Sequence, residues 1–409
     1  MKVESISLKD EYWDRGINSK RVKLLKVQQR SGVCSIIAQG YLSKMSEINQ
    51  NKMKKHFFII TMLFLSQISF AQTNEEIAIK KTKGAIRLMD EGKIEDALLL
   101  LEEAQKLDSK NIYIPYEMAV ANYLNKDYVT SIRILKKLRK RKDTNPLVFQ
   151  LLGNSYSLSD DRKNAIKTYE KGLKKFPNSG ALHLERGNME MFIENNTGAL
   201  QYYEAGIKVD PAFSSNYFWA AKLYCLTTEK VWSMIYGEIF INIETSTNRT
   251  AEISKLLFDI YKNEIQFSEE NKVSASFSDV INLEQLSDPK KFKLPFGISV
   301  YEPTLLLAVA QEKEINISSL DRIRTNYLKL YYDNGNQEKY PNVLFDYQNK
   351  MFAEGQLEAY NHWILMHGDL DGFKRWRENN PDKWDAFSDW FVYYPLKLSE
   401  TKKFYREQY

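Results

Sequence analysis

The sequence predicts an all-α protein in which about five stacked helical hairpins are followed by a helical, aromatic-rich C-terminal domain. Small residues recur every 34 positions in two separate columns, and both columns keep one register over five units. The first column is Ala85, Ala119, Gly153, Gly187 and Ala221, and the second is Ala97, Ser131, Ala165, Ala199 and Ser233. Apolar residues at helical spacing continue beyond the repeats, which predicts helices there as well.

Close packing explains why small residues recur. A small side chain lets the two helices of a hairpin approach each other, and a larger side chain later in the unit fills the seam between them. The filling column reads Leu101, Leu135, Tyr169 and Tyr203. One hairpin cannot bury its apolar face alone, so several hairpins must stack to form a core.

The unit that starts at Pro146 resembles a tetratricopeptide repeat. The residues at that family's signature spacing are Leu152, Gly153, Tyr156, Ala165, Tyr169 and Pro177. The next unit keeps Gly187, Ala199, Tyr203 and Pro211 but has Glu190 where the family usually has tyrosine. The resemblance covers residues 74–247. It implies a right-handed superhelix over residues 72–247, in which the first helix of each hairpin lines a concave groove that binds peptides.

The register implied by this resemblance predicts which side chains point into the groove. We expect an exposed polar ladder at the ninth position of three units, flanked by further inward residues. The ladder is Asn154, Asn188 and Lys222, and the flanking candidates are Gln150, Tyr116, Tyr123, Leu184 and Phe218. Asparagine amides can pair with a peptide backbone, and lysine can meet a carboxylate. The alternative is that these residues are solvated or structural, since the further cations of a full carboxylate clamp are not evident.

Residues 53–71 are predicted to be a signal peptide. A positive segment, Met53 to His56, precedes about nine mostly apolar residues, and small residues stand before a cleavage point near Ala71-Gln72. The apolar run is shorter than the ~20 residues of a membrane span; a buried helix is the alternative. We expect Met53 to be the true start and residues 1–52 to be mis-called upstream sequence, with a genuine extension as the alternative.

The signal also indicates a destination. Its composition resembles the export signals of Gram-negative, Bacteroidota-type bacteria, which implies a periplasmic or secreted protein. No transmembrane segment is expected in the mature chain, although peripheral association with the envelope stays open, as does the oligomeric state.

Residues 248–290 are predicted to be a connecting helix followed by a linker, and residues 291–409 to be the helical C-terminal domain. Four of the seven tryptophans lie in that last part. Trp384, Phe387 and Phe391 fall at positions i, i+3 and i+7, a spacing typical of a core stripe. The alternative is an aromatic platform for a glycan or small ligand.

Composition excludes several classes of function. Two cysteines and four histidines cannot build a disulfide scaffold or a cysteine-rich metal centre. The net charge of +5 is uneven, because residues 1–71 hold 12 of the 58 basic but only 5 of the 53 acidic side chains. The remainder is therefore slightly acidic, and nucleic acid is not an expected partner. The basic run from Lys136 to Lys142 is interpreted as a solvated helix end.

No motif for a nucleophile, a phosphate-binding loop or a metal pair is present. We therefore expect no catalytic residues, no metal and no cofactor. The sequence favours a non-enzymatic interaction or scaffolding protein of the bacterial cell envelope, with a peptide or protein partner in the groove. A glycan- or small-ligand-binding protein is the alternative, and an enzyme of unfamiliar class is the third possibility.

Overall fold

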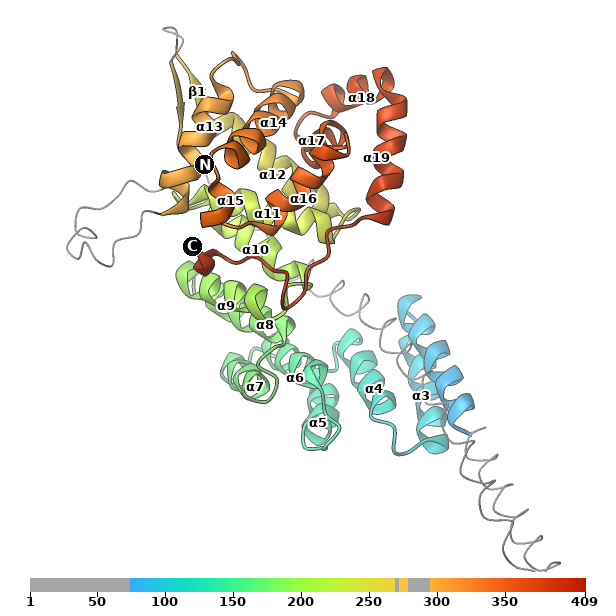
Figure 1. Cartoon of the computed structure of the whole chain (residues 1–409). Helices are drawn as coiled ribbons and strands as arrows, with labels where there is room; N and C mark the ends of the chain where they lie inside the picture. The colour runs from blue at the N-terminus through green and yellow to red at the C-terminus, as the bar shows by residue number, and fades with distance from the viewer. Residues whose placement is uncertain (1–73, 269–271, 279–294) are drawn as a thin grey trace, which may run out of the picture. The chain divides into compact units, whose positions relative to one another are not determined.

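The computed structural model describes residues 74–268, 272–278 and 295–409 (Figure 1). The expected upstream extension, residues 1–52, and the expected signal peptide, residues 53–71, lie outside the described residues. The part from Asn74 to Tyr409 is one compact unit.

Helices pair into five successive hairpins, which confirms the all-α fold and the number of units that the period predicts. The first hairpin joins the helix at 74–90 to α3 (Ile94–Leu107). The others are α4 (Tyr113–Leu124) with α5 (Tyr128–Leu138), α6 (Pro146–Leu158) with α7 (Arg162–Lys175), α8 (Gly180–Met191) with α9 (Asn196–Val209), and α10 (Ser214–Cys225) with α11 (Lys230–Ile243).

The turns inside the first four hairpins share one backbone geometry. One residue per turn adopts a positive φ, and these residues are again 34 apart: Gly92, Lys126, Asp160 and Glu194. In three units the next residue, an Asp or Asn, caps the second helix with its side chain: Asp127, Asp161 and Asn195. Each cap accepts a hydrogen bond from a backbone N–H in the first turn, which satisfies one of the donors left open there.

The small-residue columns work as the close-packing argument predicts. A Cβ added at Gly153 would lie 2.1 Å from the ring of Tyr169, and one added at Gly187 would lie 2.5 Å from the ring of Tyr203. Both tyrosines are fully buried. Glycine is therefore required because the ring of the second helix rests directly on the backbone of the first.

The connecting helix expected after the repeats is α12 (Asn248–Glu264), which packs against α10 and α11. The stretch expected to be a linker differs from the prediction. Its described part contains an antiparallel pair of short strands, β1 (Ile265–Phe267) and β2 (Val273–Ala275). The buried side chains of Ile265 and Phe277 tie this hairpin to the core. Residues 269–271 and 279–294 lie outside the described part.

The C-terminal part is helical, as predicted, and ends in an irregular segment. Its elements are a π-helical turn at Gly297–Tyr301, α13 (Glu302–Val309), α14 (Ile317–Asp333), α15 (Asn336–Lys339), α16 (Val343–Ala353), α17 (Leu357–Leu365), a 3₁₀ turn at Met366–Gly368, α18 (Leu370–Asn379), α19 (Pro381–Tyr393) and a 3₁₀ turn at Arg406–Gln408. Gly355, between α16 and α17, has a positive φ like Gly92. Each of these glycines follows a glutamate, Glu354 and Glu91, so the two turns are alike in sequence and in backbone geometry.

The aromatic residues of α19 pack against one another. The Trp384 and Phe387 rings are 5.9 Å apart, and the Phe387 and Phe391 rings are 5.5 Å apart. Phe387 is buried, whereas Trp384 and Phe391 are half-buried.

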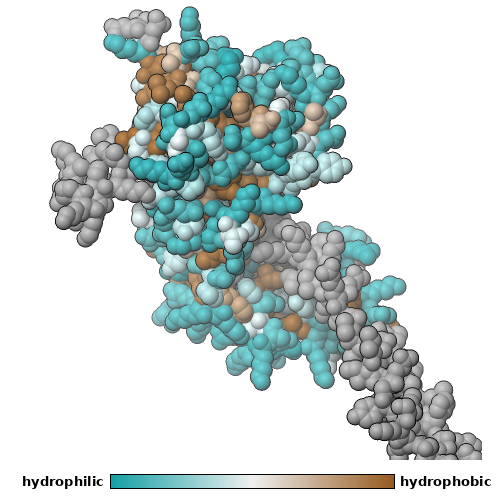
Figure 2. All heavy atoms as spheres, viewed as in Figure 1, coloured by the Kyte–Doolittle hydropathy of each residue, from teal (hydrophilic) through white to brown (hydrophobic). Residues whose placement is uncertain are grey.

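On the face in Figure 2, hydrophilic residues dominate. None of the helices in the described ranges is long and apolar enough to cross a membrane.

Candidate partner-binding site

The predicted groove residues lie on the first helices of four successive hairpins. Tyr116 and Tyr123 are on α4, Gln150 and Asn154 on α6, Leu184 and Asn188 on α8, and Phe218 and Lys222 on α10. The period therefore places the candidates on equivalent helices.

Three of these candidates converge on a carboxylate that the sequence analysis did not single out. The amide nitrogens of Gln150 and Asn188 donate hydrogen bonds to the two oxygens of Glu185, at 2.8 and 3.0 Å. Asn154 also hydrogen-bonds to this carboxylate. Burial raises the pKa of Glu185 to about 7, although the three amides counteract part of that effect. The cluster therefore has a carboxyl group whose charge changes near neutral pH.

The exposure expected for two rungs of the ladder is wrong. Asn154 is 2% exposed and Asn188 is 9% exposed. Their side-chain oxygens accept hydrogen bonds from the hydroxyls of Tyr169 and Tyr203, at 2.6 and 2.9 Å. The amides are buried because each one joins the first helix of its hairpin to the tyrosine of the second.

Lys222 belongs to a separate set of contacts. Its ammonium group lies 2.5 Å from a carboxylate oxygen of Glu252 on α12. It also lies 5.1 Å from the centre of the Phe218 ring and 5.0 Å from that of Trp219, a cation–π arrangement. Lys222 thus links the fifth hairpin to α12 while its side chain stays half-exposed.

The apolar candidates take part in packing. Tyr116, Tyr123, Leu184 and Phe218 are all buried. Tyr123 meets Tyr128 edge to face, with ring centres 5.7 Å apart, and Phe218 lies 5.3 Å from Phe240. Whether any of the eight candidates binds a partner remains a prediction, with Gln150 and Lys222 as its half-exposed members.

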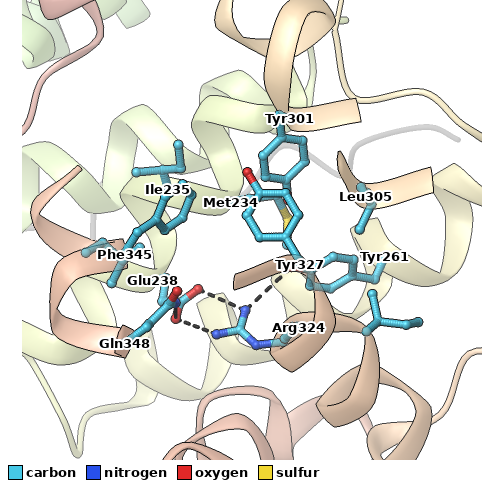
Figure 3. Close-up of a pocket in the computed structure, with 12 residues that line it drawn as sticks. Met234, Ile235, Glu238, Tyr261, Tyr301, Leu305, Arg324, Tyr327, Phe345 and Gln348 are labelled. Carbon is cyan, nitrogen blue, oxygen red and sulfur yellow. Dashed lines mark hydrogen bonds and ion pairs between the residues drawn. The ribbon is translucent and has the colours of Figure 1, made fainter. Parts of the chain in front are cut away.

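A second polar cluster surrounds a cavity of about 30 Å³ between the repeats and the C-terminal helices (Figure 3). At its base, the guanidinium of Arg324 on α14 forms two hydrogen bonds to the carboxylate of Glu238 on α11, at 2.6 and 3.0 Å. The hydroxyl of Tyr327 is buried and has no hydrogen-bond partner within the described ranges. A cavity of this size and polarity suits one or two water molecules.

This ion pair is the centre of a buried network. Gln348 on α16 and Tyr360 on α17 both donate to Glu238. The Nε of Arg324 donates to Asn361 at 2.7 Å. The network therefore fixes α14, α16 and α17 to the fifth hairpin. Because its charges are paired and its cavity is small, its chemistry suits structural attachment better than ligand binding.

No group of three or more His, Cys, Asp or Glu side chains in the described part of the chain could hold a metal ion. His362 is buried, and its ring stacks on Trp376 with centres 4.3 Å apart. Burial lowers the pKa of His362, which favours its neutral form.

Comparisons with known proteins give similarities over part of the chain. No family model matches the chain. Human tetratricopeptide repeat protein 21B is 30% identical over 141 residues, which is 34% of this chain and 10% of that protein. The chain thus spans about a tenth of the length of this curated relative.

Three solved structures show partial similarity to this chain. TTC0263 of Thermus thermophilus is 14% identical, with a TM-score of 0.37 over 44% of this chain and 98% of its own. PilF of Pseudomonas aeruginosa is 14% identical, with a TM-score of 0.39 over 47% and 87%. YrrB, described as having an unusual peptide-binding site, is 18% identical, with a TM-score of 0.30 over 44% and 92%.

Stacked hairpins of 34 residues, with glycine and tyrosine in the family's positions, define a helical-repeat protein. With the sequence match over 141 residues, they make this chain similar to tetratricopeptide repeat proteins over part of its length.

Proposed function

We propose that this protein is a non-enzymatic scaffold that binds a protein or peptide through its repeat array. The observation that carries the proposal is the run of five hairpins, because repeat arrays present extended surfaces to partners. This support comes from the fold rather than from site chemistry.

Within the array, the proposed contact face is that of α6, α8 and α10. Gln150 and Lys222 supply half-exposed polar groups there, while Asn154 and Asn188 hold the neighbouring helices in place. An amide suits the backbone of an extended peptide, and an ammonium group suits a carboxylate. The partner is therefore proposed to be an extended peptide segment with at least one acidic group.

Cross-linking capture in cells tests this proposal. The tagged full chain is compared with a Gln150→Ala/Lys222→Glu variant and with Lys171→Glu, an exposed charge reversal on α7. We expect at least one protein to be captured by the native chain and by the Lys171 control, and lost by the double variant. Circular dichroism of each purified variant checks that its helices remain intact.

Other outcomes are equally informative. A partner captured equally by all three chains would keep the scaffold proposal and remove the groove residues. No captured protein under any condition would contradict the scaffold proposal itself.

The proposed location is the periplasm or the outside of a Gram-negative cell, and the supporting observation is the signal-like segment at 53–71. Fractionation followed by N-terminal sequencing tests it. We expect a chain in the envelope or external fraction that begins at Gln72, whereas an uncleaved cytoplasmic chain would contradict this location.

A further inference from the structure

The last residues of the chain leave the C-terminal helices and pack onto the repeats. After α19 ends at Tyr393, residues 394–405 contain no helix or strand. In Figure 1 this red segment runs from α19 to the green helices of the later hairpins. Its final residues contact α9 and α11.

Arg406 lies against a buried carboxylate on α9. Its Nε and one terminal nitrogen donate to the two oxygens of Glu204, at 2.9 and 3.2 Å. The hydroxyl of Tyr224 also donates to Glu204, at 2.8 Å. The backbone N–H of Arg406 donates to the hydroxyl of Tyr236 at 2.8 Å. The carboxylate of Glu204 thus binds the guanidinium, and the hydroxyl of Tyr236 holds the backbone of the same residue.

Two aromatic side chains flank this arginine and are held by rings of the core. Phe404 is fully buried, with its ring centre 6.2 Å from those of Trp232 and Tyr236. The ring of Tyr409 lies 4.8 Å from that of Phe296. Its hydroxyl donates to the backbone carbonyls of residues 340 and 341, both at 3.0 Å.

The segment that leads to these anchors is held much less firmly. Side chains at 397, 399, 400, 401 and 402 are exposed. The hydrogen bonds recorded for Ser399 and Lys402 stay within that turn. Strong contacts are therefore concentrated in residues 403–409, the arrangement of a short peptide ligand joined to its receptor by an exposed tether.

We propose that the surface formed by Glu204, Tyr224, Trp232 and Tyr236 is a peptide-binding site, occupied here by the chain's own residues 404–409. The site recognises an arginine with an aromatic residue two positions before it and another three positions after it. If the tail left, Glu204 would lose its cation and keep only the hydrogen bonds from the hydroxyls of Tyr224 and Tyr236. A segment that brings a guanidinium in the same fork geometry would restore the pairing.

This site is separate from the proposed groove. Its residues come mainly from α9 and α11, the second helices of their hairpins, whereas Gln150 and Lys222 lie on first helices. The two proposals can therefore fail independently.

A nicked protein tests the site directly. A protease recognition sequence replaces residues 397–402 of the full chain, and the folded protein is then cut. A fluorescent peptide with the sequence of residues 399–409 is added, and its anisotropy is measured. We expect saturable binding to the nicked protein and at least tenfold weaker binding to the uncut chain, because a tethered tail competes at a high effective concentration.

Two peptide variants show which contacts matter. The Arg406→Ala peptide is expected to bind at least tenfold more weakly, whereas Lys402→Ala, which changes only the exposed tether, should bind like the native peptide. A nicked, folded protein that binds no peptide, or that binds the Arg406→Ala peptide equally well, would overturn the proposal.

A second measurement decides the matter if cutting unfolds the protein. Hydrogen exchange of the uncut chain is compared with that of Glu204→Gln. The proposal expects at least tenfold faster exchange at residues 404–409, with unchanged exchange in α3 to α5. Unchanged exchange in the tail would overturn it.

Discussion

Replacing Gly153 by alanine is expected to destabilise the third hairpin, although alanine is the better helix former. The new methyl group would lie 2.1 Å from the ring of Tyr169, about 1.5 Å inside an ordinary carbon contact. The ring is fully buried and bonded to Asn154, so it cannot simply swing away. Overpacking of this kind costs about 1–3 kcal/mol, and a lost hydrogen bond adds about 1 kcal/mol. The gain in helix propensity offsets about 1 kcal/mol.

The net expectation is a free energy of unfolding about 1–3 kcal/mol lower than in the native chain. Thermal melting followed by circular dichroism should show a midpoint several degrees lower. Gly84→Ala is the matched control, because its methyl would meet only the end of the flexible Leu100 side chain, at 3.0 Å. That variant should be neutral or slightly more stable. A Gly153→Ala protein as stable as the native chain would refute the close-packing argument.

Substitutions at three further sites test other parts of the structure. Arg324→Met leaves Glu238 buried without its cation and should lower the free energy of unfolding in urea by about 3–5 kcal/mol. Adding Glu238→Leu should recover a large part of that free energy. A double variant no more stable than Arg324→Met would contradict the pairing. Glu185→Gln tests the pKa raised to about 7. Between pH 4.5 and 7 the folded state binds more protons than the unfolded state, so the native chain should lose stability as pH rises. Compared with the Glu185→Gln variant, the native chain should have lost about 3 kcal/mol of unfolding free energy by pH 8. Parallel stability-against-pH curves for the two proteins would contradict the raised pKa. Glu194→Gly removes a Cβ from a residue with φ of 58° and should raise the melting temperature slightly, whereas Glu194→Ala should not.

The repeats could be predicted from the sequence because their contacts are local and periodic. Gly153 and Tyr169 are 16 residues apart, and the same spacing recurs at Gly187 and Tyr203, so one register fixes both contacts. The 15-residue spacing from Asn154 to Tyr169 also recurs, from Asn188 to Tyr203, and could have shown that these amides are internal.

The contacts that complete the molecule carry no such signal. Glu238 and Arg324 are 86 residues apart, and Glu204 and Arg406 are 202 apart. Neither pair repeats, and a single charged residue in a helix looks the same whether it is solvated or paired. Glu185 stands on a helix that also carries Arg186 and Glu190, so its neighbours in the sequence do not show that it is buried.

The buried pair between α11 and α14 also gives the array two unlike ends. A hairpin in a repeat array is stabilised chiefly by its neighbours, so opening normally starts at whichever end is uncovered. Here the fifth hairpin is covered by α12 and bound to the C-terminal helices, while the first hairpin has a described repeat on one side only. Local opening should therefore spread from α3 toward α9. The protection of backbone amides against hydrogen exchange would then increase along the repeats. The later hairpins would act as a fixed base for the more labile earlier ones.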